Sequence, residues 1–311
     1  MSRLLITGAA GFLGSHLIDH LSSTEHEIVG VDNLRRGRCE YIEKALGSGR
    51  MEFVTADIRD YDAIKRSTAG VDTVFHLAAQ SNVMGSLGDK DYSFETNVVG
   101  TYNVLKAASE AGVKRLVFSS SREVYGEPVR LPVKEDDTLR PKNPYGASKL
   151  AGEAYCRSFD ATSGLSCGVI RFGNLYGSRD RDRVIPIWLE NGVQGKDLVI
   201  YGGEQVLDFV PVQFAVSALI AMAASDAFGP INVATGVGIS LRDLAARILA
   251  VTGSTSRTVV EPARAVEVVH FVADISRMKD CLGIEPPADP LAGLADMATG
   301  HIVEFLGQPL T

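Results

Sequence analysis

The chain has 311 residues, of which 45% are hydrophobic and 22% are charged, a composition typical of a soluble globular protein. Its formal net charge of −7, from 31 basic and 38 acidic residues, disfavours a nucleic-acid partner. No apolar run approaches the roughly 18 residues of a membrane span, so no membrane segment is predicted. The four cysteines are scattered and never spaced as metal ligands, which predicts no metal site, no disulfide framework and a cytoplasmic location; they are Cys39, Cys156, Cys167 and Cys281.

Short apolar runs alternate with helical patterns through the first half of the chain. Strands are predicted over 3–8, 27–32, 51–57, 73–79, 115–121 and 164–174, and helical patterns over 12–21 and 97–112 lie between them. The strands are apolar throughout rather than alternating, which is typical of a parallel sheet covered on both faces. The sequence therefore predicts a doubly wound α/β fold of the Rossmann type.

The pattern changes after Tyr176. A basic loop over 179–183 is followed by further apolar runs, and helices are predicted over 216–228 and 240–253. We expect a first domain over residues 1–176 and a smaller α/β lobe over 177–311. The two are predicted to be interleaved, because the run 230–236 has the character of a strand that returns to the main sheet.

A glycine-rich turn directly follows the first predicted strand. The segment GAAGFLG places Gly8, Gly11 and Gly14, with Phe12 and Leu13, at the start of an apolar-faced helix. Glycines let the backbone approach a pyrophosphate, and the helix N-terminus offers unpaired N–H groups to it. This turn predicts a dinucleotide site.

Acidic residues at two strand ends refine this prediction. Asp32 ends the second strand, at the position where a carboxylate accepts hydrogen bonds from the adenosine ribose, which favours NAD over NADP. The nearby Arg35 and Arg36 could bind the 2′-phosphate of NADP, so NADP is the alternative cofactor. Asp57 ends the third strand and could hold the adenine amino group, and a plain helix N-cap is the alternative.

Tyr145 and Lys149 in the segment PYGASKL are four residues apart, which places them on one face of a helix. A nearby ammonium group and an oxidised nicotinamide would both stabilise a tyrosinate, which could then take a proton from an alcohol. Ser121, at the end of a predicted strand, lies where it can bond the same alcohol oxygen. An exposed aromatic and lysine pair is the structural alternative.

These segments, taken together, resemble the extended short-chain dehydrogenase/reductases, the NAD-dependent nucleotide-sugar epimerase/dehydratase family. The matching pieces, in the family's order, are TGAAGFLG, Asp32, the DI at 57, HLAA from His76, NVVGT from Asn97, SSS, YGASK and RFGNLYG from Arg171. Weaker matches run nearly to the end of the chain.

The resemblance implies a tightly bound NAD that oxidises a sugar hydroxyl, usually at C4, is reduced in that step, and is reoxidised later, so that no net redox change occurs. It makes Tyr145 the base, Lys149 its partner, and Ser121 the third member of the site. It assigns further residues to the cofactor: Asn33, Ile58, Leu77, Ala78, Ala79 and Asn97. It assigns others to a UDP-hexose substrate: Ser86, Arg122, Asn174, Arg179, Val184, Arg264 and Glu267. For Arg264 and Glu267 an exposed charged loop is an equal alternative.

The reaction depends on the two residues after Ser121. The 4,6-dehydratases of the family carry Asp-Glu there, and this chain has Arg122-Glu123. Glu123 resembles the dehydratase base at C5, whereas an arginine cannot replace the aspartate that protonates the departing C6 hydroxyl. We therefore predict a dehydratase that returns hydride to C4 and leaves a 5,6-alkene, as in the UDP-GlcNAc dehydratase of the antibiotic tunicamycin pathway, to which the chain is predicted to be related.

Alternatives remain open at this point. The chain could be a UDP-hexose 4-epimerase with Glu123 turned toward Arg122, or an NAD-binding sensor without chemistry. Leu207 stands where many relatives carry a diphosphate-binding arginine, and Arg179, Arg181 and Arg183 could compensate. The resemblance also implies a homodimer formed through two helices, one of them the helix that carries Tyr145.

Overall fold

The computed structural model describes residues 1–227, 229–264 and 266–306, and a seven-stranded parallel sheet forms its centre. The strand order is β10-β6-β5-β4-β1-β2-β3. The strands are β1 (Arg3–Thr7), β2 (Glu27–Asp32), β3 (Met51–Thr55), β4 (Thr73–His76), β5 (Arg115–Ser121), β6 (Ser166–Phe172) and β10 (Gly229–Val233). This topology confirms the doubly wound α/β prediction, including the return of the chain to the sheet at β10.

Helices cover both faces of this sheet because neighbouring strand residues point to opposite sides. Leu4 and Ile6 pack under α1 (Phe12–Leu21), α9 (Val212–Ala224) and α11 (Ser276–Leu282). Leu5 packs on the other side, under α3 (Tyr61–Ser67), α6 (Thr101–Glu110) and α7 (Pro144–Ser163). The predicted helix over 216–228 corresponds to α9, and its last residue, 228, lies outside the described residues.

The longest of these helices, α7, starts at a clear local signal. Asn143 caps it by accepting a hydrogen bond from the Gly146 amide at 2.8 Å, and Pro144 occupies the first turn, where no amide partner is needed. It ends at Gly164, which has a φ of +74°. This helix holds Tyr145 and Lys149 in its first two turns.

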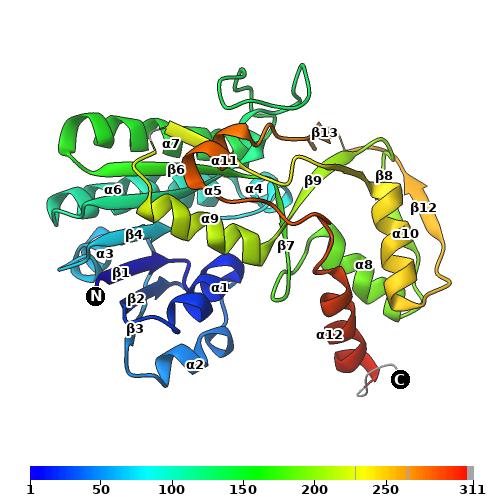
Figure 1. Ribbon diagram of the computed structural model, residues 1–311, viewed down its shortest axis with the longest axis horizontal. Coiled ribbons are helices and arrows are strands. Elements are labelled where there is room, and N and C mark those ends of the chain that lie inside the picture. The colour runs from blue at the N-terminus through cyan, green and yellow to red at the C-terminus, as the bar shows by residue number, and fades with distance from the viewer. Residues whose placement is uncertain (228, 265, 307–311) are drawn as a thin grey trace.

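A second, smaller lobe lies at the carboxyl ends of the main strands, on the right of Figure 1. It contains a four-stranded sheet of β7 (Asn174–Tyr176), β9 (Val206–Pro211), β11 (Gly238–Ser240) and β13 (His270–Phe271), and a pair of β8 (Leu198–Tyr201) and β12 (Thr258–Glu261). Its core packs these strands against α8 (Val184–Val193), α10 (Leu241–Thr252) and α12 (Leu294–Leu306). The second predicted helix, over 240–253, corresponds to α10.

The remaining short elements lie on the loops around the carboxyl edge of the sheet and in the β2–β3 connection. They are η1 (Cys39–Tyr41), α2 (Glu43–Leu46), α4 (Val83–Gly88), α5 (Lys90–Phe94), the π-helical turn η2 (Glu95–Gly100) and the 3-10 turn η3 (Arg122–Val124). Among the described helices, none is long and apolar enough to cross a membrane.

Asp208 joins the smaller lobe to the main sheet. It is fully buried on β9 and accepts hydrogen bonds from the Thr235 amide at 2.8 Å, the Thr235 hydroxyl at 2.6 Å and the Gly236 amide at 2.9 Å. Burial raises the pKa of this carboxyl, and the hydrogen bonds lower it. Asp208 therefore fixes β9 against the loop that leaves β10.

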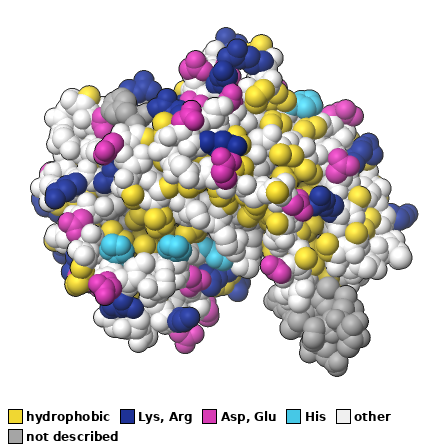
Figure 2. Space-filling view, in the orientation of Figure 1, with side chains coloured by type: hydrophobic (Ala, Val, Ile, Leu, Met, Phe, Trp, Pro, Cys, Tyr) yellow, Lys and Arg dark blue, Asp and Glu magenta, His cyan; other side chains and the backbone are white. Residues whose placement is uncertain are grey.

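Surface charges of both signs are mixed on the face that Figure 2 shows, without a large basic area.

Candidate active site

A cavity of about 1000 Å³ runs along the carboxyl edge of the main sheet and under the smaller lobe. This is the place where open α/β sheets bind ligands. Most of the predicted site residues line it: Gly8, Gly11, Phe12, Leu13, Gly14, Asp32, Asn33, Ile58, Leu77, Ala78, Ala79, Ser121, Arg122, Glu123, Tyr145, Lys149, Asn174, Val184, Arg264 and Glu267. The structure thus brings together residues that are far apart in the sequence.

The glycine turn has the close backbone contacts that a dinucleotide needs. A Cβ atom on Gly14 would lie 2.1 Å from the carbonyl oxygen of Gly8, so any side chain there would force the turn apart. Gly8 itself has a φ of +73°, and a Cβ atom there would lie 2.8 Å from the Ala78 amide nitrogen. The turn and the N-terminus of α1 therefore form a tight cradle that suits a pyrophosphate.

Asp32 is held in place by the backbone at the end of β2. Its carboxylate accepts hydrogen bonds from the Leu34 amide at 2.8 Å and from the Ala10 amide at 3.1 Å. Burial raises the pKa of Asp32, and these two amides lower it. Each carboxylate oxygen keeps acceptor capacity for a ribose hydroxyl, so the geometry fits an adenosine ribose.

Tyr92 lines the same cavity as Asp32, and two arginines contact its ring. The guanidinium of Arg35 stacks 3.8 Å from the Tyr92 ring centre, and that of Arg59 lies 4.9 Å from the same centre. Arg35 is thus engaged by an aromatic ring. Together with Arg36 it still lines the cavity, beside Asp32.

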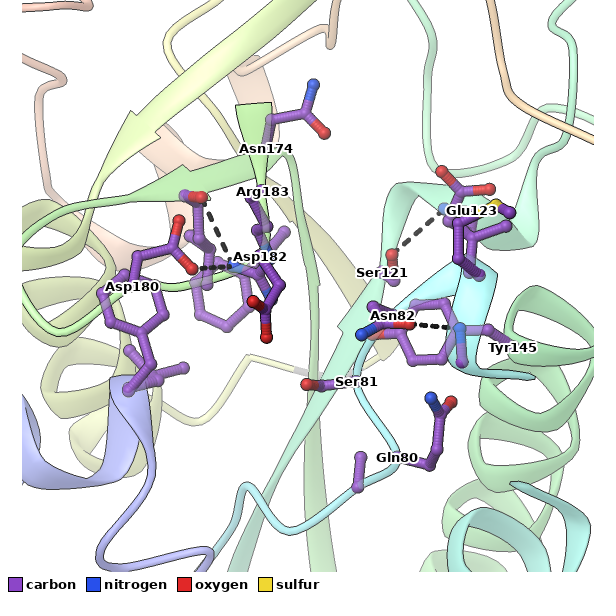
Figure 3. Close-up of a pocket in the computed structure, with 18 of the residues that line it drawn as sticks. Gln80, Ser81, Asn82, Ser121, Glu123, Tyr145, Asn174, Asp180, Asp182 and Arg183 are labelled. Carbon is purple, nitrogen blue, oxygen red and sulfur yellow. Dashed lines mark hydrogen bonds and ion pairs between the residues drawn. The ribbon is translucent and has the colours of Figure 1, made fainter. Parts of the chain in front are cut away.

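Ser121, Tyr145 and Lys149 all line the cavity, and Figure 3 shows Ser121 and Tyr145 on the same side of it. Burial raises the pKa of Tyr145, whereas the positive charge of Arg183 and hydrogen bonding to Ser121 lower it. Lys149 donates a hydrogen bond to the Ser119 carbonyl at 2.7 Å, and burial lowers its pKa to about 8. The nitrogen of Lys149 lies 5.9 Å from the centre of the Tyr145 ring.

Arg183 faces these residues from the start of α8, with Asp180 beside it (Figure 3). Its guanidinium lies 3.5 Å from an oxygen of Asp180. Asp180 is buried, and burial raises its pKa to about 6. Its other oxygen is buried without a hydrogen-bond partner in the described part of the chain. The sequence showed Asp180 only as one acid in a basic loop, so its burial could not be predicted.

Glu123 lies at the edge of the catalytic group and is already paired on both oxygens. One oxygen lies 3.0 Å from Arg122, and the other accepts a hydrogen bond from Asn143 at 2.8 Å. The side chain is 6% exposed, so this pairing is shielded from solvent. Asn143 was missed in the sequence, although its place before Pro144 marks it as a helix cap.

Arg122 is in turn connected to Asn174. Its Nε donates a hydrogen bond to the Asn174 side-chain oxygen at 2.8 Å, and its side chain is 11% exposed. The result is a chain of contacts from Asn143 through Glu123 and Arg122 to Asn174 on β7.

Four predicted residues lie outside the cavity lining. Asp57 pairs with Arg59 and accepts a hydrogen bond from Asn33 at 2.8 Å. Asn97 bonds the Gln80 backbone and the Ser148 hydroxyl. Ser86 is buried in α4, and Arg179 pairs with Asp19 at 2.8 Å. Asp57 and Asn97 thus contact residues that line the cavity, Asn33 and Gln80.

No cluster of metal-ligating residues is found within the described ranges. The buried histidine, His76, is engaged by the hydroxyls of Thr7 at 2.7 Å and Thr101 at 2.9 Å. Burial lowers the pKa of His76 to about 3, so it is a neutral packing residue at physiological pH.

The comparisons with known proteins agree with this geometry. Residues 4–234 match the NAD dependent epimerase/dehydratase family. A UDP-glucose 4-epimerase from Mycolicibacterium smegmatis is 36% identical over 301 residues, which cover 94% of this chain and 96% of that protein.

Two solved structures extend the comparison to three dimensions. A UDP-N-acetylglucosamine 4-epimerase from Methanobrevibacter ruminantium superposes with a TM-score of 0.93 at 31% identity, over 97% of this chain and 99% of that one. A dTDP-glucose 4,6-dehydratase from Streptomyces venezuelae, with NAD bound, superposes with a TM-score of 0.91 at 30% identity, over 98% of both chains.

Proposed function

The chain belongs to the NAD-dependent epimerase/dehydratase family, and from this premise we propose that it is a 4-epimerase of a UDP-linked hexose. The observation that carries the proposal is the placement of Ser121, Tyr145 and Lys149 in one cavity with the glycine turn and Asp32. NAD is the cofactor of this family, and bound NAD supplies a hydride acceptor and donor at C4.

Tyr145 acts as the base in this proposal. It takes the proton from the C4 hydroxyl as hydride leaves, and Ser121 holds the same oxygen by a hydrogen bond. Arg183 favours the ionised tyrosine electrostatically. Lys149 adds a second positive charge from below the ring whenever it is protonated. After the sugar turns in the cavity, Tyr145 returns the proton to the C4 oxygen, and the reduced cofactor, when bound, would return the hydride to the other face of C4.

The contacts of Glu123 favour epimerisation over dehydration. A base at C5 becomes protonated, and protonation of Glu123 would remove the charge that pairs with Arg122 in this buried place. The neighbouring Arg122 cannot supply the proton that a departing C6 hydroxyl needs. The sequence alone favoured a dehydratase, and these contacts lead us to prefer its alternative.

A 5,6-dehydratase remains the second candidate, because Glu123 does line the cavity. A substrate that displaced Asn143 would free one oxygen of Glu123. UDP-GlcNAc as the substrate and a relation to the tunicamycin-pathway enzyme stay predictions. The cytoplasmic location and the alternative function as an NAD-binding sensor also stay predictions.

Incubation of the purified protein with UDP-glucose and UDP-GlcNAc in D2O tests the proposal. Epimerisation predicts a product of unchanged mass, with inverted C4 and no deuterium on carbon. Loss of one water would establish a dehydratase instead: a 5,6-alkene product carries no deuterium on carbon, whereas a 4,6-dehydration product carries deuterium at C5. If a protein that carries NAD converts no UDP-hexose, the sensor hypothesis replaces both.

A further inference from the structure

The turn after β2 and the loop 178–183, which connects β7 to α8, meet in a strained contact. Within the described ranges, three residues other than glycine have a positive φ: Leu34 at 57°, Arg179 at 67° and Asp182 at 62°. Such a φ is costly for a residue with a side chain and persists only where the surrounding contacts hold it. Leu34 lies in the turn, and the other two lie in the loop that contacts this turn. The strained residues therefore gather where the smaller lobe touches the first domain.

Several contacts fasten the loop to the first domain. Arg181 donates a hydrogen bond to the Arg36 carbonyl at 2.6 Å, and Arg179 pairs with Asp19 at 2.8 Å. The guanidinium groups of Arg179 and Arg181 lie 5.4 Å and 6.0 Å from the centre of the Tyr41 ring. These contacts come from residues on several segments, and together they hold the loop over the turn after β2.

The contact also neutralises an arginine beside the expected site of the adenosine ribose. The Nη2 atom of Arg36 lies 3.2 Å from a carboxylate oxygen of Asp182, and both residues line the cavity with Asp32. Figure 3 shows Asp182 together with Arg183, on the opposite side of the view from Tyr145. The charge of Arg36 is therefore matched by an acid that belongs to the other lobe.

The second arginine of this turn is engaged as well, because Arg35 stacks 3.8 Å from the centre of the Tyr92 ring. An arginine beside this ribose is the usual partner of the 2′-phosphate of NADP, which it binds by charge-assisted hydrogen bonds. The turn thus carries two cations suited to NADP, and the structure gives both of them other partners.

We propose that Asp182 is a specificity-determining residue for the cofactor: it occupies the guanidinium of Arg36, which would otherwise bind the 2′-phosphate of NADP, and so favours NAD. Asp32 repels a 2′-phosphate directly, whereas Asp182 acts through Arg36. This inference goes beyond the proposed reaction, because it concerns the choice of cofactor and involves no sugar.

The test compares two adenosine nucleotides that differ only in a 2′-phosphate, by their displacement of radiolabelled NAD from the full-length chain. Adenosine 2′,5′-bisphosphate carries this group, and adenosine 5′-phosphate lacks it. In Asp182→Asn, the affinity of the bisphosphate relative to the monophosphate should rise roughly tenfold at low salt, because an arginine–phosphate contact replaces the ion pair. The rise should be smaller at high salt. The side chain of Asp182 is 76% exposed, so this variant should fold.

Asp19→Asn is the matched control. It breaks another ion pair of the same loop, and Asp19 lies outside the cavity lining, so the ratio of the two affinities should not change. A second control combines Asp182→Asn with Arg36→Gln and is compared with Arg36→Gln alone. The rise should disappear in this background, since the arginine that would bind the phosphate is then missing.

An unchanged ratio in Asp182→Asn would overturn the proposal. An equal rise in Asp19→Asn would show that the loop acts only by its overall attachment, and a rise that survives Arg36→Gln would show that Asp182 repels the phosphate without Arg36. Either result would contradict the role assigned to this ion pair. Because no measurement uses a sugar, failure of the epimerase proposal would leave this test and its result intact.

Discussion

Tyr145 is the residue whose chemistry the proposed function needs most. In the proposal its hydroxyl moves a proton at C4, and its hydrogen bond with Ser121 distinguishes it from the other tyrosines that line the cavity, Tyr92, Tyr176 and Tyr201. Tyr145→Phe should lower kcat about 10²- to 10⁴-fold and leave the fold and NAD binding intact. Steady-state kinetics measures kcat, and the absorbance of the bound NAD shows whether the variant still binds the cofactor. A variant with near wild-type kcat would remove Tyr145 from the base role.

The pH dependence of the reaction depends on Arg183. Burial raises the pKa of Tyr145 and the charge of Arg183 lowers it, so the active tyrosinate forms as the pH rises. Arg183→Gln removes a lowering effect, and the acidic limb of the kcat/KM profile should therefore shift to higher pH. An unchanged profile in this variant would show that Arg183 does not act on Tyr145. Arg257→Gln, on an exposed pair with Asp197 and outside the cavity lining, is the control.

Most residues of this site could be predicted from local sequence motifs. The side chains that they contact could not be predicted. The glycines, Asp32, Ser121, Tyr145 and Lys149 carry local signals and all line the cavity. The pairing of Glu123 with Asn143, and the orphaned atoms of Arg122, Asn174 and Asp180, depend on contacts between distant segments. Four predicted residues lie outside the lining because their side chains contact other segments: Asp57, Ser86, Asn97 and Arg179. Their motif positions could be read from the sequence, but those contacts could not.

At the scale of elements, the loop 178–183 connects the smaller lobe to α1 and to the turn after β2. Asp182 pairs with Arg36 at 3.2 Å, and Arg181 donates to the Arg36 carbonyl at 2.6 Å. Arg179 pairs with Asp19 on α1 at 2.8 Å. Two of the three arginines that were expected to grip a diphosphate are thus turned toward the first domain, and Arg183 alone of the three lines the cavity.

This loop should slow the release of NAD. Asp182 and Arg36 line the cavity and are exposed, so their ion pair contributes about 0.2–1 kcal/mol. Asp182→Ala should raise the dissociation rate of NAD up to about fivefold at low salt, with a smaller effect at high salt. Stopped-flow release of NAD measures it. A change that persists unreduced at high salt would contradict an ionic origin.

The strands of the main sheet could be predicted because they are buried on both faces and follow one another with helices between them. The strands of the smaller lobe are short, and β7, β11 and β13 have two or three residues each. Their pairing with β9 is fixed by segments distant in sequence, which no local pattern records.

At the scale of the whole molecule, the predicted boundary at 176 divides the sequence but not the main sheet. β10 pairs with β6, and α9 covers the sheet with Ala215, Ala218 and Leu219 fully buried. A fragment of residues 1–176 would expose the surface that these elements cover. It should fail to unfold cooperatively in urea, and a sharp two-state transition would contradict the interleaved arrangement.

The homodimer stays a prediction, and the outer faces of α6 and α7 are where we expect it. Tyr102 and Tyr155 are each 40% exposed there, with ring centres 5.5 Å apart. Light scattering should report a dimer for the wild-type chain and a monomer for Tyr155→Arg, because a buried, unpaired charge is costly. A dimer that survives this substitution would place the interface elsewhere.

The central claim, that hydride leaves C4 and returns to the same carbon, is tested most directly with a substrate deuterated at C4. After conversion in ordinary water, the account predicts a product with inverted C4 that keeps its deuterium there. Deuterium found at C6, or lost to solvent, would contradict it.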